Sequence, residues 1–225
     1  VGTSLVYNSI TFSGTAYNIG STGGAINLAS GINAIRNTGA SNTLDVSLVF
    51  GGDSTITVNA STALTLGTVG ASTLTNGNSL LTLSSLGSTL INSDINDAAG
   101  TGTALLISGS GGSVTLAGTG SSYTGATTIA SGTVKLTNAN SLGSSAGITL
   151  VQSGAVLDLN GTAATVAEPI TINGSGIAGA GALVNSTSST PTLSGDITLG
   201  STGCLIGIAN GTTTIGDNGD TVAIN

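Results

Sequence analysis

The most informative stretch for the fold is residues 112–161, which read GSVTLAGTGSSYTGATTIASGTVKLTNANSLGSSAGITLVQSGAVLDLNG. Short apolar segments alternate here with turns rich in Gly, Ser and Asn. Val134 and Leu136 flank Lys135, and Asp158 likewise lies between two leucines. Alternation with a period of two is typical of half-buried β-strands. We therefore expect strands of three to six residues that end at Gly and Asn, which adopt positive φ at little cost.

Landmarks recur along the chain at a nearly constant interval. Ser-Gly pairs begin at positions 108, 131, 153, 175 and 194, so that their successive differences are 23, 22, 22 and 19. The triplet Ile-Thr-Leu at 148–150 recurs as Ile-Thr-Ile at 170–172, and Pro169 recurs as Pro191, both at an interval of 22. A repeat of about 22 residues fits one coil of a β-helix, in which stacked coils bury a core that no single coil could bury.

This repeat predicts an all-β protein made of roughly ten coils, a rod on the order of 50 Å long. We expect one β-solenoid segment over residues 1–225, less regular in 1–107 and clearest in 108–215. In the first part, residues 42–50 alternate until Val49 and Phe50 follow each other, where the pattern slips. An antiparallel sandwich or barrel is the alternative. It explains the short strands but not the constant interval.

Three segments of this stretch resemble a known bacterial repeat. They are Tyr-Thr-Gly-Ala-Thr-Thr-Ile at 123–129, Gly-Thr-Val-Lys-Leu at 132–136 and Gly-Ala-Val-Leu-Asp-Leu-Asn-Gly at 154–161. The order and composition are similar to the passenger-associated repeat of bacterial autotransporters, with Val134 where that pattern usually has Leu. The resemblance covers about a third of the chain. It implies a right-handed parallel β-helix that is exported and displayed at, or released from, the bacterial surface.

The charge of the chain argues against several classes of partner. Nine acidic residues face only two basic ones, Arg36 and Lys135, and the net charge is −7. Nucleic-acid binding requires many cations along a phosphate backbone, so we expect no nucleic-acid partner. No apolar run approaches the roughly 18 residues that span a bilayer, so we expect no membrane insertion of this segment. The chain starts at Val1 without a signal-peptide pattern, and we interpret it as a processed chain or a segment of a longer one.

The residues for catalysis or metal binding are sparse. Without His, a Ser-His-Asp or Cys-His arrangement cannot form within the chain. Two carboxylate pairs remain, Asp94 with Asp97 and Asp217 with Asp220, and glycan-active β-helices use such pairs. We interpret both as polar turns. The segment 217–220 is also a weak candidate for a calcium turn, although no complete calcium-loop motif is present. We therefore predict no enzyme, no cofactor and no catalytic, cofactor-binding or metal-site residue.

Two further features have alternative interpretations. Cys204 is the single cysteine, so it can form no disulfide within the chain, and we expect a small buried apolar side chain or an interchain bond. Thr-rich solenoid faces can order water, as in β-helical ice-binding proteins. Thr55 with Thr57 and the run at 212–214 stand isolated in the sequence, so we do not expect a regular array of threonines.

The sequence thus predicts a structural scaffold at the cell surface or outside it, such as a stalk, a filament or a surface layer. Neighbouring copies are the expected partners, because the open ends of a solenoid expose unpaired strand edges. The alternative is an adhesin passenger that binds host surfaces or sister cells. Such interfaces are usually rich in Tyr, Trp and Arg. This chain has three Tyr, no Trp and one Arg. An ice-binding or glycan-active β-helix is the third possibility.

Overall fold

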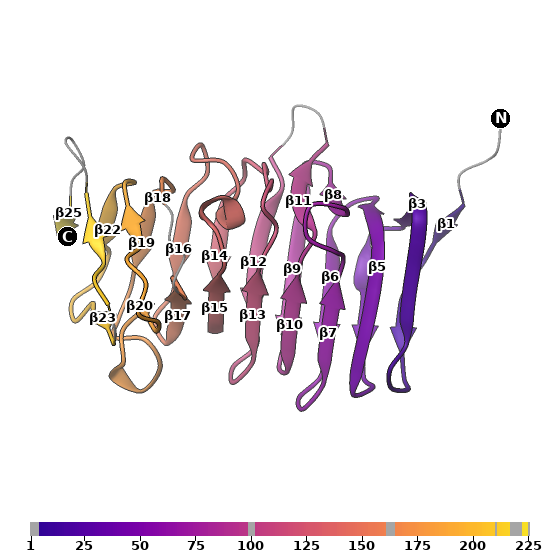
Figure 1. Cartoon of the computed structure of the whole chain (residues 1–225), viewed down its shortest axis with the longest axis horizontal. Coiled ribbons are helices and arrows are strands. Elements are labelled where there is room, and N and C mark those ends of the chain that lie inside the picture. The colour runs from indigo at the N-terminus through magenta and orange to yellow at the C-terminus, as the bar shows by residue number, and fades with distance from the viewer. Residues whose placement is uncertain (1–4, 99–101, 161–164, 210, 217–221, 225) are drawn as a thin grey trace.

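The computed structural model describes residues 5–98, 102–160, 165–209, 211–216 and 222–224. The chain is a parallel β-solenoid of about nine turns with about 23 residues per turn. Successive coils lie side by side along the long axis, from β1 and β3 at one end to β23 and β25 at the other (Figure 1). The predicted all-β, parallel β-helical fold is confirmed, and the antiparallel alternative is wrong for the strands described.

Two long parallel sheets form most of the wall of the solenoid. The first has twelve strands: β1 (Val6–Tyr7), β3 (Asn18–Leu28), β5 (Ser41–Phe50), β7 (Ala63–Leu66), β10 (Ser88–Ile91), β13 (Ser113–Leu116), β15 (Gly132–Leu136), β17 (Ala155–Asp158), β20 (Leu183–Asn185) and β23 (Ile206–Ile208), with β8 (Thr73–Asn76) and β11 (Asp94–Asp97) branching from β5. The second has ten: β2 (Ile10–Phe12), β4 (Gly31–Asn37), β6 (Ser54–Val58), β9 (Leu80–Ser85), β12 (Ala104–Ser108), β14 (Thr127–Ile129), β16 (Thr149–Val151), β19 (Ile170–Ile172), β22 (Ile197–Leu199) and β25 (Val222–Ile224).

A shorter third side completes the coil. Strand β5 is long enough to pair with β7 through its first half and with β8 through its second half. Toward the other end a three-stranded sheet contains β18 (Thr165–Val166), β21 (Thr192–Leu193) and β24 (Thr214–Ile215). Two 3₁₀ turns lie in the corners, η1 (Ala139–Leu142) and η2 (Ile177–Gly179). The described residues contain no longer helix.

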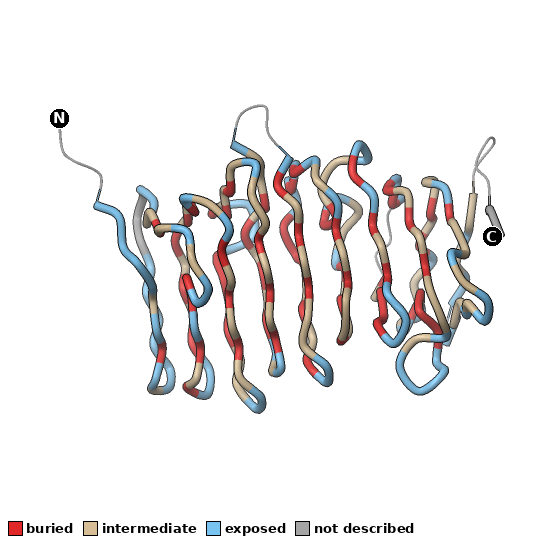
Figure 2. Tube along the Cα trace, turned by 180° about the vertical axis from the view of Figure 1, so that it is seen from behind, coloured by how far each residue is buried: buried red, intermediate tan, exposed pale blue. Residues whose placement is uncertain are grey.

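Inward side chains form aliphatic columns along the axis, because each strand sits in register on the one before it. One column in the ten-stranded sheet contains Ile56, Leu83, Ile107, Ile129, Val151 and Ile172, all of them buried. Figure 2 shows the consequence as buried residues that alternate with partly exposed ones in coil after coil. The buried apolar side chains from Phe12 to Ile197 form one continuous core cluster. Each coil is therefore stabilised mainly by its two neighbours.

The length of a coil varies more than the landmarks predicted. The pairings of Ile107 with Ile129 and of Ile129 with Val151 keep the expected interval. The next interval, from Val151 to Ile172, is one residue shorter than the predicted 22. The interval after it, from Ile172 to Leu199, is five residues longer than predicted. Extra residues are accommodated in the corners, so the register within the sheets survives. Two register shifts interrupt the early strands, one in the pairing of β3 with β5 and one in that of β4 with β6.

Two details of the predicted pattern are wrong. The alignment of landmarks matched Thr149 with Thr171, whereas the structure pairs Thr149 with Ile170. A shift of one residue exchanges the two faces of a strand, so Thr149 points into the core while Ile148 is half exposed. The expected slip at the end of β5 does not occur either. Burial alternates to the end of that strand, because Phe50 packs inward after Val49 points outward.

One corner shows why glycine is required there. Gly132 opens β15 with φ of 82°, a conformation that glycine adopts at little cost. A Cβ at this position would also lie 2.5 Å from the carbonyl oxygen of Gly109 in the preceding coil. Both the dihedral angle and the close approach of two coils therefore exclude a side chain.

Candidate functional site

Asp94 and Asp97 do not form a joint acid–base site. They stand three residues apart in β11, and side chains at that separation in an extended strand project to opposite faces. The carboxylate of Asp94 accepts a hydrogen bond from the backbone N–H of Gly120 at 2.8 Å. Asp97 accepts bonds from the backbone N–H of Thr103 at 2.6 Å and from the N–H and hydroxyl of Thr124 at 2.9 and 2.6 Å. Both carboxylates thus organise loops of the chain, but they do so from within strand β11, so the interpretation of this pair as a polar turn between strands is wrong.

The same arrangement recurs along the solenoid. Asp53 accepts from the backbone N–H of Leu80, 27 residues later, at 2.8 Å. Asp158 accepts from the backbone N–H and the hydroxyl of Ser186, 28 residues later, at 3.2 and 2.7 Å. We call Asp53, Asp94, Asp97 and Asp158 the carboxylate clamps, since each joins its own coil to the next. A carboxylate that accepts backbone N–H groups makes a strong, charge-assisted bond.

Asp217 and Asp220, together with the weak calcium candidate at 217–220, lie outside the described residues. Among the residues that are described, no group of three or more Asp, Glu, His or Cys side chains is placed to hold a metal ion. The clamps are separated along the rod and lie in three different coils, with Asp94 and Asp97 in the same one. Their spacing provides linkage between coils and no concentrated site.

Cys204 packs against the end of the core and is partly exposed. Its Sγ lies 3.0 Å from the carbonyl oxygen of Ile172 and 3.0 Å from that of Ser201. A thiol in such contacts behaves as a small apolar group with a weak donor. Cys204 is therefore only partly buried, whereas a buried side chain was expected.

The outer face of the ten-stranded sheet carries a column of threonines that the sequence spacing concealed. In register along this face lie Thr55, Thr82, Leu106, Thr128, Leu150, Thr171 and Thr198. We call these seven residues the threonine column. Coils of unequal length still align these threonines, although they stand apart in the sequence. The column contains no charge, is interrupted by two leucines and is not the paired Thr-x-Thr array of an ice-binding face.

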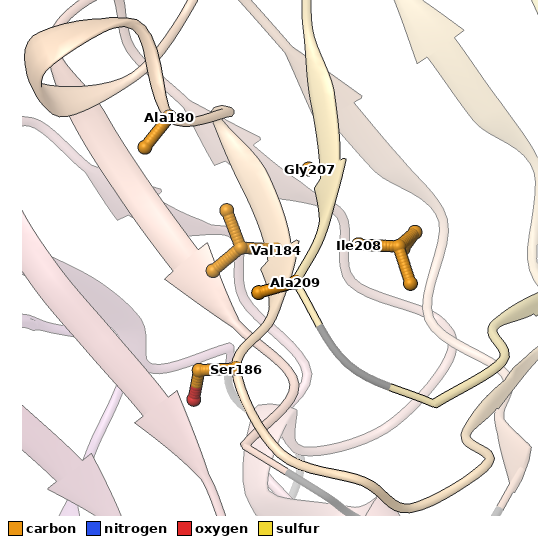
Figure 3. Close-up of a pocket in the computed structure, with 6 residues that line it drawn as sticks. All are labelled: Ala180, Val184, Ser186, Gly207, Ile208 and Ala209. Atoms are coloured by element: carbon orange, nitrogen blue, oxygen red, sulfur yellow. The ribbon is translucent and has the colours of Figure 1, made fainter.

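A shallow apolar pocket lies on the outside of the twelve-stranded sheet (Figure 3). It has a volume of about 330 Å³ and is lined by Ala180, Val184, Ser186, Gly207, Ile208 and Ala209, which come from the η2 turn, from β20 with the residue after it, and from β23 with the residue after it. The only polar side chain in the lining is the hydroxyl of Ser186, which already binds Asp158. Such a lining can contact a small apolar group but provides no catalytic chemistry.

The sequence interpretation overlooked Glu168. It is the only glutamate of the chain and is 4% exposed, between β18 and β19. Burial raises its pKa from 4.5 to about 7, because water no longer stabilises the charged form, and a hydrogen bond from Thr149 offsets part of this effect. Only one feature of the sequence pointed to this residue, and it was weak. A single Glu before Pro169 stands out only because every other acidic residue is Asp.

The comparisons with known proteins add no relative. The described residues include no helix of the length and apolarity needed to cross a bilayer. No family model, curated protein or solved structure matches the chain.

Proposed function

We propose that this chain is a structural scaffold at or outside the bacterial cell surface, with no enzymatic activity of its own. One observation carries this proposal: a single core runs through the coils, and the carboxylate clamps join adjacent coils by further hydrogen bonds. A rod built this way resists bending and local opening, because no coil can separate without exposing two apolar faces. The resemblance of residues 112–161 to the autotransporter repeat supports export and surface display.

The proposal includes association with neighbouring copies. In the described part, β1 and β2 at one end and β23 and β25 at the other each pair on one side only. Unpaired edges of this kind accept another parallel strand. A further coil, from the same chain or from another, would continue both long sheets.

Adhesion to a host or sister-cell surface is the second candidate. The threonine column favours it, since this uncharged column, with Leu106 and Leu150 partly exposed, can approach another surface without desolvating a charge. Binding through such a face would depend on many weak contacts and therefore on avidity. Screening the chain against immobilised glycans and matrix proteins, with Thr128→Lys as a variant that places a charge in the column, distinguishes adhesion from a purely structural role.

Negative-stain electron microscopy of the purified chain at several concentrations tests the scaffold. Filaments of uniform width that lengthen with concentration are expected if open edges join copies. Short separate rods at every concentration would contradict self-association and leave a rigid spacer as the role. Compact particles would contradict the scaffold itself.

A further inference from the structure

A second column on the outer face of the ten-stranded sheet is entirely apolar. It runs beside the threonine column, two residues earlier in each coil, and begins where the sheet pairs Leu80 with Ala104. In the next three coils its carbonyl oxygens accept hydrogen bonds from backbone N–H groups of the preceding coil, so the ladder continues without a break. We call these five residues the apolar column: Leu80, Ala104, Ala126, Ile148 and Pro169.

The apolar column is accessible to solvent in the middle of the rod. Ile148 is 51% exposed and Ala126 is exposed, while the other three members are partly exposed. Leu106 and Leu150 of the threonine column lie next to it and are partly exposed as well. Single apolar side chains are common on protein surfaces, but a contiguous apolar patch marks a site of contact with another molecule.

This part of the face carries no charge. On the other side of the threonine column lies a third column of small or polar residues, and none of the three columns contains a charged residue between β9 and β19. The residues of the third column are Ser84, Ser108, Ala130, Gln152 and Asn173.

The carboxylates of the chain lie elsewhere. Asp53 and Asp196 border the face in the coils of β6 and β22, and the other described aspartates lie in strands of the twelve-stranded sheet. The chain has a net charge of −7, so two copies repel each other over most orientations. A contact through the five coils from β9 to β19 brings no charged side chain of one copy against the other.

The shape of the patch fits a second copy of the same patch. In a two-fold symmetric contact each surface meets itself in reverse order. An axis that runs along β14 through Thr128 would place Leu106 opposite Leu150. It would also place the small Ala104 opposite the larger and more exposed Ile148. The strands of the two sheets stay aligned in this arrangement, as in packed β-sheets.

The area is sufficient for a specific but weak contact. Five coils at about 4.8 Å give a length of roughly 24 Å, and three columns at about 6.7 Å give a width of roughly 20 Å. Each copy would therefore bury about 500 Å², or about 1,000 Å² for the pair. This value lies at the lower limit for specific protein interfaces. Association should thus depend on concentration.

We infer that the apolar column and the threonine column between β9 and β19 form a lateral interface, through which two copies of the chain pair side by side about a two-fold axis. The inference deepens the proposed association of copies, and it rests on that proposal only in requiring copies to meet. The lateral interface uses a face of the rod, whereas end-to-end association uses the open strand edges, so either can fail without the other.

Sedimentation velocity and small-angle X-ray scattering over a series of concentrations test the inference. We expect a monomer–dimer equilibrium in which the dimer has almost the same maximum dimension as the monomer, because the rods lie side by side. Joining two rods end to end would instead nearly double that dimension.

Substitutions that place charge in the patch provide the second part of the test. Thr128→Lys puts two like charges at the two-fold axis, and Ile148→Lys replaces the most exposed apolar side chain of the column. Each should weaken dimerisation at least about tenfold, since a charge would be buried without a partner. Thr65→Lys is the matched control, because Thr65 is a partly exposed residue on the outer face of the twelve-stranded sheet. It should leave the dimer unchanged, and circular dichroism verifies that all three variants are folded.

Three results would overturn the inference. A chain that stays monomeric at every concentration would rule out the lateral interface. A dimer of about twice the length of the monomer would assign association to the ends, in agreement with the proposed function but not with this inference. A side-by-side dimer that is unchanged in folded Thr128→Lys and Ile148→Lys, or equally weakened in Thr65→Lys, would show that this patch is not the surface of contact.

Discussion

Replacing Glu168 by glutamine is expected to remove most of a pH dependence of stability that the parent chain shows between about pH 4.5 and 7. The folded-state pKa of this carboxyl group is raised to about 7 from an ordinary value of 4.5. The folded protein therefore holds this proton more tightly than the unfolded chain does. The stability that results is fully present below pH 4.5, decreases as the pH rises and is lost above pH 7.

The magnitude follows from the size of the shift. A difference of about 2.5 pKa units at 1.36 kcal/mol each corresponds to about 3 kcal/mol of unfolding free energy. Glu168 also lines a polar cavity with Asn140, Ser144 and Thr165, and water there screens part of the charge, so we expect a measured difference of about 1–3 kcal/mol. Most of the effect should appear between pH 5 and pH 8. Glutamine keeps the shape of the side chain without the charge, so the variant should be the more stable of the two at pH 8. At pH 5 the variant and the protonated parent should agree within roughly 1 kcal/mol, the worth of one altered hydrogen bond.

Equilibrium unfolding in urea, followed by circular dichroism at pH 5 and pH 8, measures this difference without the screening that guanidinium would introduce. Asp45→Asn is the matched control, because it removes a partly exposed carboxylate from the outer face of β5. That control should keep the pH dependence of the parent. If the parent were equally stable at both pH values, or if Glu168→Gln kept the same dependence, the reasoning about burial of this carboxylate would be refuted.

Three more substitutions probe the clamps, the corners and the core by the same unfolding assay. Asp97→Ala leaves three donors without their acceptor, but the two on Thr124 are exposed and can bind water, so the loss should be about 1–2 kcal/mol; a loss below roughly 0.5 kcal/mol would contradict its role as a clamp. Gly132→Ala should destabilise the chain by at least about 1 kcal/mol more than Gly154→Ala. The two positions have similar positive φ, but only at Gly132 would a Cβ meet a neighbouring carbonyl oxygen. Equal losses of stability would refute the clash with that oxygen. Leu136→Ala should cost about 2–5 kcal/mol while Lys135→Ala stays within roughly 0.5 kcal/mol, and similar losses for the two would contradict the alternation of β15.

Local patterns in the sequence were sufficient to predict the class of fold. Strand β15 illustrates this, because Val134 and Leu136 are buried and Lys135 is not, as their alternation predicted. The repeat predicted stacked coils for a physical reason. A coil with one apolar face is unstable by itself, so a regular recurrence of such faces implies that they cover one another. The interval was most accurate where coils have equal length, from Ile107 to Val151.

The register between coils depended on tertiary structure. A change of a few residues in one corner moves every later landmark, but the sheet realigns the strands by their hydrogen bonds and apolar faces. The threonine column therefore became visible only in the folded chain, as did the inward orientation of Thr149. No local pattern records how many residues a corner absorbs.

The sequence by itself determined that this chain forms short alternating strands, stacked in coils with few charges between them. Only the tertiary structure decided which carboxylates bind the next coil and which one remains buried with an oxygen that has no partner among the described residues. Asp97 is the last residue of β11 and Glu168 lies two residues before β19, and nothing in the local sequence pattern distinguishes their environments. One partner of Asp97 follows it closely in sequence and the other lies in the next coil. Glu168 instead lines a cavity together with residues 139–145 from the corner of the preceding coil. The environment of a side chain in a solenoid is provided by the adjacent coils, so its chemistry is settled only when those coils are in place.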